Sequence, residues 1–360
     1  MAEIRQRLTN SSLGSSSGSQ TGTVSSVNRP FRGRPSTQKA LNALIGTLLL
    51  LQLVPLLWLL LNPSQTLESE ELPSLERLPS NSIDSIRVKC AGFGSTQLTV
   101  LQSDIQAQWA ADPLTIFEYQ FSNRAHEINW FGKTKVGGDV DSLDPRVFVV
   151  SVTYPNIYRY FRGLLQRRSK LELTLRLTNP LINFELDGCA GNFVWQGPHV
   201  TGDFNVSLEK GNVHLMTSLE AKRLNVWTGY GAIGTSNITV LESVSLKTGA
   251  GSVRATVGGY QTLTATTKAG SVDVYLKPGT NESFNIVEAP AGNLFLKMLG
   301  FWGKFVGKTM TGSSSFHGVE WPLESFNPPL GYVGKNRSAT GFVSVKAGDW
   351  MSLWFDQYGE

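Results

Sequence analysis

The chain has 360 residues, of which 41% are hydrophobic and only 17% are charged, and its formal net charge is +4 at pH 7. This size suits one large domain or two ordinary ones, with a substantial core. The basic residues are spread along the chain without a dense patch beside stacking aromatics, which argues against nucleic-acid binding. The 36 glycines favour turn-rich β structure over a helical bundle.

The chain begins with a tail that is rich in serine, glycine and threonine. Residues 1–38 contain few apolar side chains. Such a segment cannot bury enough apolar surface to compensate the entropy of ordering it. We therefore predict a disordered cytosolic tail.

A long apolar stretch follows the tail. Residues 40–62 are dominated by leucine and contain no charged side chain. About 20 apolar residues cross a bilayer, so this stretch predicts a single transmembrane helix that acts as a signal anchor. A cleaved signal peptide is the alternative, but its apolar core is normally only about 7–15 residues long.

The charges on either side of the apolar stretch predict its orientation. Six Arg and Lys residues precede it, and four Glu residues follow within residues 63–82, a Pro- and Glu-containing segment that we interpret as a stalk. Basic flanks remain on the cytoplasmic side. We therefore expect a single-pass type II protein of the plasma membrane or of a secretory-pathway membrane, with an extracellular or lumenal C-terminal part.

Two further sequence features agree with that orientation. Four glycosylation sequons lie after the apolar stretch, at Asn205, Asn237, Asn281 and Asn336; N-x-Ser/Thr sequons are modified in secreted proteins. The only cysteines, Cys90 and Cys189, lie there as well. An oxidising compartment would permit a disulfide between them, worth about 4–5 kcal/mol in the chain-entropy model. Two buried free thiols are the alternative.

The predicted folded part begins at residue 83. Residues 83–183 contain two stretches of alternating apolar residues, RVFVVSVTYP and KLELTLRLTN, and alternation of this kind predicts strands. The segment between them, residues 157–170, mixes aromatic and basic residues in a pattern that we interpret as helical. We therefore expect a β-rich N-terminal part of the ectodomain.

A unit of about 20 residues repeats through the next part of the chain. Each copy is marked by a glycine: Gly191, Gly211, Gly231, Gly251, Gly270 and Gly292. The residues five positions before and two positions after the glycine are apolar in all six copies. One unit cannot bury its own apolar side chains, but stacked units can, so the repeat predicts an all-β fold with a parallel β-solenoid over residues 184–296. The glycine either adopts a positive φ or permits close backbone approach.

An antiparallel β-sandwich is the alternative, because strand–turn units of about 8–12 residues also give a hairpin period near 20. Residues 297–360 are predicted to form a cap and a terminal rung. We expect residues 294–308 to form a helical cap over the open end of the solenoid, with docking on a membrane surface or a glycan as the alternative. The terminal rung is aligned on Gly348, with Val343 and Trp350 in the two inward positions.

The repeats also carry a family resemblance. The stretches TGAGSVRATV from Thr248 and TTKAGSVDVYL from Thr266 resemble an adhesin-type domain family of unknown function, found in bacteria and eukaryotes, whose Thr/Ser-Gly-x-Val rungs stack as a β-helix. The resemblance covers residues 184–296. The threonine before the glycine is present only at Thr228, Thr248 and Thr267. The resemblance implies cell-surface binding and no catalytic residues.

The sequence offers no recognisable catalytic or metal site. Its four histidines are His126, His199, His214 and His317. No two of them have metal-ligand spacing, and the chain lacks a zinc motif, a nucleophile elbow and a phosphate-binding loop. We therefore predict no enzyme activity, no metal and no cofactor.

The positions expected to point outward from the repeats are mixed. They are Asp187, Ser207, Trp227, Lys247, Thr266 and Glu288. Because carboxylates are not stacked on adjacent rungs, the pair that glycoside hydrolysis requires is not apparent. The sequence predicts a non-catalytic, adhesin-like binding module for a glycan or a cell-surface ligand. The alternatives are a polysaccharide-modifying enzyme on a β-helix and a scaffold subunit of a membrane protein complex.

Overall fold

The computed structural model describes part of the chain in two compact units, residues 1–65 and 66–360. The described residues are 42, 44–48, 51, 75–78, 83–92, 95–102, 115–118, 122–123, 135–154, 170–177, 180–280, 282–324, 330–333 and 340–356. The described residues of the first unit are helical. They include no helix that is long and apolar enough to cross a bilayer. The predicted tail, most of the predicted anchor and residues 157–169 of the predicted helix lie outside the described residues. Within the predicted stalk only residues 75–78 are described, and they form a strand.

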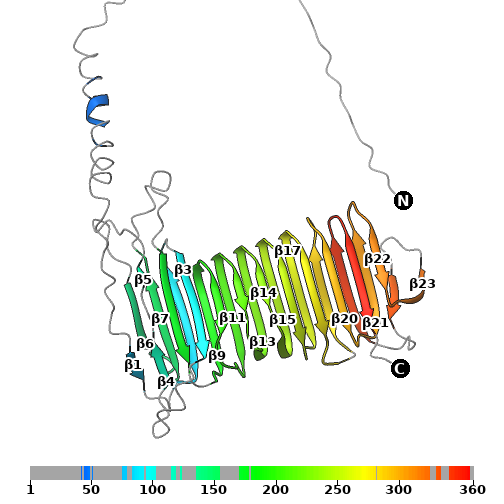
Figure 1. The fold of residues 1–360 in the computed structure, drawn as a ribbon, viewed down its shortest axis with the longest axis horizontal. Helices are drawn as coiled ribbons and strands as arrows, with labels where there is room; N and C mark the ends of the chain where they lie inside the picture. Colours follow the sequence, from blue (N-terminus) through cyan, green and yellow to red (C-terminus); the bar gives the residue numbers. More distant parts are fainter. Residues whose placement is uncertain are drawn as a thin grey trace, which may run out of the picture. The chain divides into compact units, whose positions relative to one another are not determined.

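The second unit is all-β, as predicted, and most of its strands belong to one sheet with many parallel pairings. The chain alternates between two ladders of strands, which we call face A and face B (Figure 1). In the repeats, a strand of face A pairs in parallel with the next strand of face A, about 20 residues later, as in Asn205 opposite Asn225. We call one strand of face A and the face B strand that follows it a rung. The strands of the repeats therefore pair in parallel, and not antiparallel as in the alternative β-sandwich.

Face A comprises ten strands in spatial order: β7 (Val147–Thr153), β2 (Ser85–Ala91), β9 (Asn183–Ala190), β11 (Asp203–Lys210), β13 (Glu220–Tyr230), β15 (Ile238–Ala250), β17 (Thr262–Ala269), β19 (Phe284–Ala289), β25 (Gly341–Ala347) and β21 (Gly303–Thr309). Face B comprises β8 (Lys170–Leu177), β3 (Ser95–Gln102), β10 (Phe193–Gln196), β12 (Val213–Leu215), β14 (Ile233–Thr235), β16 (Val253–Gly258), β18 (Val272–Lys277), β20 (Leu294–Leu299), β26 (Met351–Asp356) and β22 (Ser314–His317).

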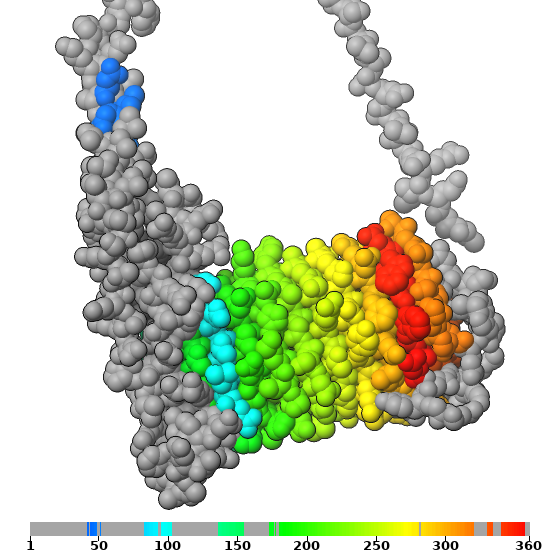
Figure 2. All heavy atoms as spheres, in the orientation of Figure 1, coloured from blue at the N-terminus to red at the C-terminus, as the bar shows by residue number. Residues whose placement is uncertain are grey.

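The rungs at both ends of this stack are out of chain order. The rung β2/β3 precedes β7/β8 in the chain, yet it lies between β7/β8 and β9/β10. The rung β25/β26 follows β21/β22 in the chain, yet it lies between β19/β20 and β21/β22. In Figure 2 the red atoms of the last strands accordingly lie beside the outermost orange atoms. The stack therefore extends beyond residues 184–296 at both ends.

Antiparallel strands border the outermost rungs. At one end β6 (Lys135–Val140) pairs with β7 and β5 (Ser122–Asn123) pairs with β8. At the other end β24 (Leu330–Val333) pairs with β21, and β23 (Glu320–Glu324) pairs with β24. A small separate sheet joins β1 (Leu75–Leu78) to β4 (Thr115–Glu118). These antiparallel partners occupy edges that would otherwise expose unpaired backbone groups.

The helical cap predicted at residues 294–308 is wrong. This segment forms β20 and the greater part of β21, two strands joined by a short turn. Burial alternates along this segment, since Leu294, Leu296 and Met298 are fully buried while the residues between them are partly exposed, and that period suits a strand. The terminal rung is also shifted from the predicted register, because Met351 and not Trp350 lies opposite Leu294.

The core lies between the two faces and consists of inward columns of side chains. Every residue five positions before a repeat glycine, from Leu186 to Val287, is buried, as is every residue two positions after it, from Phe193 to Leu294. Large rings fill the space near the first repeats, where Trp195 lies 4.8 Å from Phe184 and 4.9 Å from Phe204, centroid to centroid. Such rings bury the most area per residue.

The repeat glycines form one column at the turn between face A and face B. Gly231 has φ +149°, and a Cβ built on it would lie 2.0 Å from the carbonyl oxygen of Gly211 in the preceding rung. Gly231 therefore combines the positive φ and the close backbone approach that we expect of a repeat glycine. The same close approach relates each later repeat glycine to the one before it, at Gly251, Gly270 and Gly292.

The threonine of the repeats supports the same turn from inside. Thr228, Thr248 and Thr267 are buried. Each donates its hydroxyl proton to the carbonyl oxygen of the glycine in the preceding rung: Thr228 to Gly211 at 2.9 Å, Thr248 to Gly231 at 2.8 Å and Thr267 to Gly251 at 2.8 Å. A buried hydroxyl needs such a partner, so this column accounts for threonine in an otherwise apolar core.

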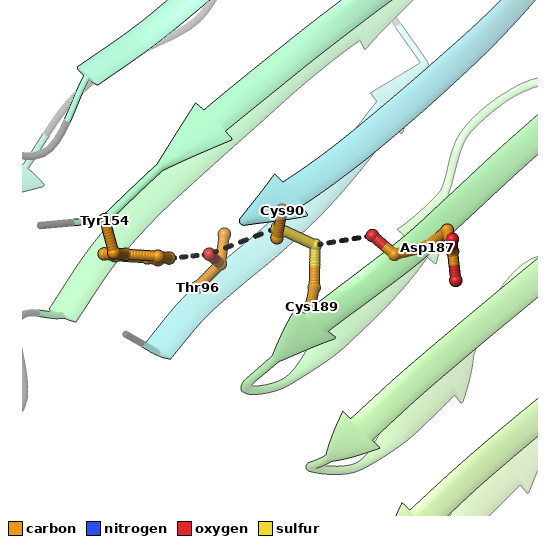
Figure 3. The surroundings of a disulfide bond; sticks show 5 residues. All are labelled: Cys90, Thr96, Tyr154, Asp187 and Cys189. Atoms are coloured by element: carbon orange, nitrogen blue, oxygen red, sulfur yellow. Dashed lines mark hydrogen bonds between the residues drawn. A yellow bond between two sulfur atoms is a disulfide. The ribbon is translucent and has the colours of Figure 1, made fainter. Parts of the chain in front are cut away.

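The predicted disulfide between Cys90 and Cys189 is confirmed. It joins β2 to β9, and Cys189 lies opposite Leu208, in the column that Thr228 occupies two rungs further along. Figure 3 shows Thr96 beside the disulfide, with its hydroxyl hydrogen-bonded to that of Tyr154. The bond therefore fixes the out-of-order rung β2/β3 to the first repeat.

Candidate functional site

A hollow among the described residues lies on the outer surface of face A. It is a shallow depression of about 180 Å³ over β9, β11, β13 and β15. Its outward-facing lining residues are Glu185, Asp187, Asn205, Ser207, Asn225, Trp227 and Ser245. These positions alternate with buried Leu186, Val206 and Val226, so the strand period itself presents the polar side chains to solvent.

Trp227 forms the apolar part of this depression. Its side chain is 45% exposed, although large aromatic side chains are usually well buried. It points outward from β13 and lies between Ser207 and Lys247 of the neighbouring strands. An exposed indole beside small polar residues offers a flat surface and an N–H donor to a ligand.

Amide side chains form a ladder next to Trp227. Asn205 lies opposite Asn225, and the Asn225 amide donates to Asn205 Oδ1 at 2.8 Å. The same column continues to Glu185 on one side and Ser245 on the other. Because neighbouring strands are about 4.8 Å apart, the column presents donors and acceptors at regular intervals along face A.

A second depression adjoins the first. It measures about 260 Å³ and shares Glu185 and Asn205 with the first, so the two are adjacent on face A; we call them together the groove. The other polar side chains that line it are Asp84, Ser85, Arg87, Asp144, Arg146, Asn183 and Asp203. The groove therefore changes from amides and an indole at one end to paired charges at the other.

Ion pairs hold the charged end in place. Arg87 contacts Glu185 at 2.5 Å and Asp141 at 3.1 Å, while Arg223 makes two hydrogen bonds of 2.6 Å to Asp203. The hydrogen bond to Glu185 raises the pKa of Arg87 although burial opposes this, and Asp203 likewise raises the pKa of Arg223. Asp187 is exposed and has no ion-pair partner among the described residues.

A backbone hydrogen bond also fixes one carboxylate of the groove. The backbone N–H of Arg146 donates to Asp144 at 3.0 Å, and this contact is the main reason that the pKa of Asp144 is lowered. Arg146 also reaches Asp84, at 3.8 Å. The contact with the Arg146 backbone favours the ionised form of Asp144, which suits recognition of a ligand more than proton transfer.

The histidines do not converge on this groove. His199 is exposed, His214 lies on β12 of face B, and His317 stacks on Trp354 of face B at 3.8 Å between centroids; His126 lies outside the described residues. Within the part of the chain that the structure describes, no three His, Cys, Asp or Glu side chains are grouped as metal ligands.

The predicted outward column lies in register along face A. Ser207, Trp227, Lys247, Thr266 and Glu288 are paired from strand to strand, with Asp187 on β9 before them. Only Asp187, Ser207 and Trp227 line the groove. No sequence motif pointed to Glu185, Asn225 or Arg87. An offset of 20 residues from Asn205 in either direction would have found the first two.

The predicted glycosylation residues fall in different places. Asn205 lies inside the groove, and Asn237 is exposed between β14 and β15. Asn281 and Asn336 are outside the described residues. Thus, of the two sequon residues that the structure describes, Asn205 coincides with the candidate site and Asn237 does not.

Face B carries a second group of exposed aromatic residues. Tyr275 and Phe295 lie 5.6 Å apart, and Trp354, which is 37% exposed, stacks on His317. Lys297, paired with Asp356 at 2.6 Å, lies between Tyr275 and Trp354 in this column. Neither of the two depressions described above includes these residues.

Comparisons with known proteins identify no family for the chain. No family model matches it, and no curated protein does. Among solved structures, an adhesin from Bacteroides fragilis, so assigned provisionally, aligns at 13% identity and TM-score 0.39, over 78% of this chain and 96% of its own. A provisionally assigned adhesin from Parabacteroides merdae aligns at 11% identity and TM-score 0.32, over 79% of this chain and 96% of its own. A provisionally assigned cell adhesion protein from Clostridium sporogenes aligns at 12% identity and TM-score 0.26, over 78% of this chain and 98% of its own. The function proposed below therefore rests on the residues of this chain.

Proposed function

We propose that the chain is a non-catalytic, adhesin-like module that binds an extended carbohydrate in the groove of face A. The observation that carries this proposal is the exposed Trp227 beside a hollow of amides, hydroxyls and carboxylates. A sugar ring has an apolar face of C–H groups and a rim of hydroxyls. Trp227 suits the apolar face, while Asn225, Ser207 and Asp187 suit the hydroxyl rim.

The repeat supports a chain-like ligand. The groove crosses successive parallel strands, from β2 to β15, so its polar side chains recur in one direction. Individual sugar contacts are weak, and several of them on one polymer add through effective concentration. The ligand would therefore be an oligosaccharide that spans several strands.

The polysaccharide-modifying enzyme remains the principal alternative. Glu185 and Asp187 project from the same face of β9, as two catalytic carboxylates would have to. However, Glu185 is held by Arg87 at 2.5 Å. A carboxylate fixed in an ion pair is poorly suited to proton donation. The experiment below measures cleavage as well as binding.

We also propose that this module is displayed on the outer or lumenal side of a membrane by a type II signal anchor at residues 40–62. The support is the uncharged leucine-rich stretch, the basic residues before it and the acidic residues after it. Protease protection of sealed microsomes tests it. Protection of residues 83–360, with digestion of the tail, is expected; the opposite pattern would overturn the proposed orientation.

A panel of soluble oligosaccharides, offered to protein freed of N-glycans and measured by binding and by product analysis, tests the function. We expect retention of at least one oligosaccharide without cleavage, and a loss of about tenfold in affinity for Trp227→Ala. Trp354→Ala is the matched control, because Trp354 has similar exposure on face B. Equal losses in both variants, or none in either, would overturn the assignment of the site, and bond cleavage would favour the enzyme.

A further inference from the structure

We infer that an N-linked glycan on Asn205 occupies the groove of face A, so that only the unmodified form of the protein binds a ligand there. This inference rests on the proposed function and on the proposed outer or lumenal location. The sequence predicts both glycosylation at Asn205 and ligand binding on the outward face. A glycan and a ligand would compete for the same groove, so glycosylation would regulate binding.

The sequon lies inside the binding site. Asn205 and Ser207 both line the depression beside Trp227. They project outward from β11, on either side of the buried Val206. Any sugar attached to Asn205 therefore begins within the groove and not at its border.

The hydrogen bonds of Asn205 leave the attachment atom free. Its Oδ1 accepts from Asn225 at 2.8 Å. Its Nδ2, to which the first sugar is linked, donates to no side chain or backbone group among the described residues. An attached glycan therefore breaks no contact of the amide ladder, and the ladder fixes the direction in which the glycan leaves the strand.

Trp227 is within reach of that glycan. It lies on the neighbouring strand, two residues beyond the partner of Asn205, since Asn205 pairs with Asn225. Strand spacing and rise place the two Cα atoms about 8 Å apart. The first two N-acetylglucosamine units can cover this distance, and the indole offers them the stacking surface proposed for a ligand.

Asn237 provides the contrast within the same chain. It is exposed between β14 and β15 and lines neither depression. A glycan at Asn237 would leave the groove open. Thr239→Ala removes this sequon and serves as the matched control for modification elsewhere on the protein.

The experiment uses the full-length chain purified from glycosylating cells, before and after native treatment with peptide N-glycosidase. Glycopeptide mass spectrometry measures occupancy at Asn205 and Asn237. The enzyme converts Asn205 to aspartate, which keeps the oxygen that accepts from Asn225.

The probe for binding is chitohexaose, because it repeats the N-acetylglucosamine units with which an N-glycan begins. Acrylamide quenching, taken as the difference between the wild type and Trp227→Phe, measures access to Trp227.

We expect Asn205 to be occupied, and enzyme treatment to raise both the quenching of Trp227 and the affinity for chitohexaose, the latter about tenfold. The Thr239→Ala protein should show the same increases. An unoccupied Asn205, or an occupied one whose removal leaves quenching unchanged, would overturn the inference. Increased quenching without binding of chitohexaose or of any oligosaccharide in the panel would support the glycan's position and count against the proposed function instead.

Discussion

Cys90 and Cys189 are separated by 99 residues in the chain, but their Cα atoms lie 4.9 Å apart and a disulfide joins them. The bond connects β2, the first strand of the coil in sequence, to β9, which begins the repeats. Between these strands in sequence the chain forms β7 and β8, which lie on the far side of β2 and β3. The disulfide thus closes the loop that contains the outermost rung.

Reduction of this disulfide should destabilise one end of the stack selectively. The chain-entropy model gives about 4–5 kcal/mol for a loop of this length. We expect hydrogen exchange, measured after reduction and alkylation, to accelerate in β2 and β3 while β15 and β17 retain their protection. Uniform acceleration along all rungs would contradict this, because it would mean that the stack unfolds only as a whole.

Gly231→Ala should be strongly destabilising. The substitution places a side chain at φ +149° and sets Cβ 2.0 Å from the carbonyl oxygen of Gly211, so we expect a loss of about 3 kcal/mol or more in the free energy of unfolding. Gly258→Ala is the control, since its Cβ would meet nothing closer than 3.7 Å. Denaturant titration of both variants measures the difference; comparable losses would refute the role of the glycine column.

Tyr260→Phe should stabilise the protein, most of all in alkaline solution. The Tyr260 hydroxyl is buried without a hydrogen-bond partner among the residues that the structure describes, and burial raises the pKa of this phenol well above its ordinary value. Removing an unsatisfied buried hydroxyl should gain about 1 kcal/mol at neutral pH. Because the folded state resists ionisation, the wild type loses stability as the pH rises above about 10, where the unfolded phenol ionises.

Unfolding free energies of the wild type and Tyr260→Phe between pH 7 and a strongly alkaline pH provide the measurement. The gap between the two proteins should widen with increasing pH above about 10, since the variant lacks this ionisable group. A constant gap would show that the Tyr260 hydroxyl finds a partner or ionises normally in the folded protein.

The sequence predicted the repeating part of the fold because its determinants are local. Alternation at positions such as Val226 and Leu246 predicted which side chains are buried, and both are. The spacing of Gly211 and Gly231 predicted where the chain turns from one face to the other. The same local view failed at residues 294–308, where a mixture of aromatic and basic residues predicts a helix. Pairing with neighbouring strands makes this segment β20 and most of β21 instead.

The candidate site was predictable only in part. The outward orientation of Trp227 followed from the repeat. The hollow beside it depends on Glu185, Asn205 and Asn225, which are brought side by side by pairing between strands. The 20-residue period identifies Asn225 and Glu185 as the neighbours of Asn205, but it does not show that the side chains there leave a hollow.

By itself, the sequence determined the all-β class, the period of about 20 residues, the inward columns and the identity of the only two cysteines able to pair. These follow from side-chain alternation and backbone conformation, which act over a few residues. Only the tertiary structure decided the spatial order of the end rungs, the strands joined by Cys90 and Cys189, and the meeting of Asn205 with Trp227. The reason is physical: strands with the same alternation are compatible with many partners, and the choice among them is made by packing and pairing between residues distant in the chain.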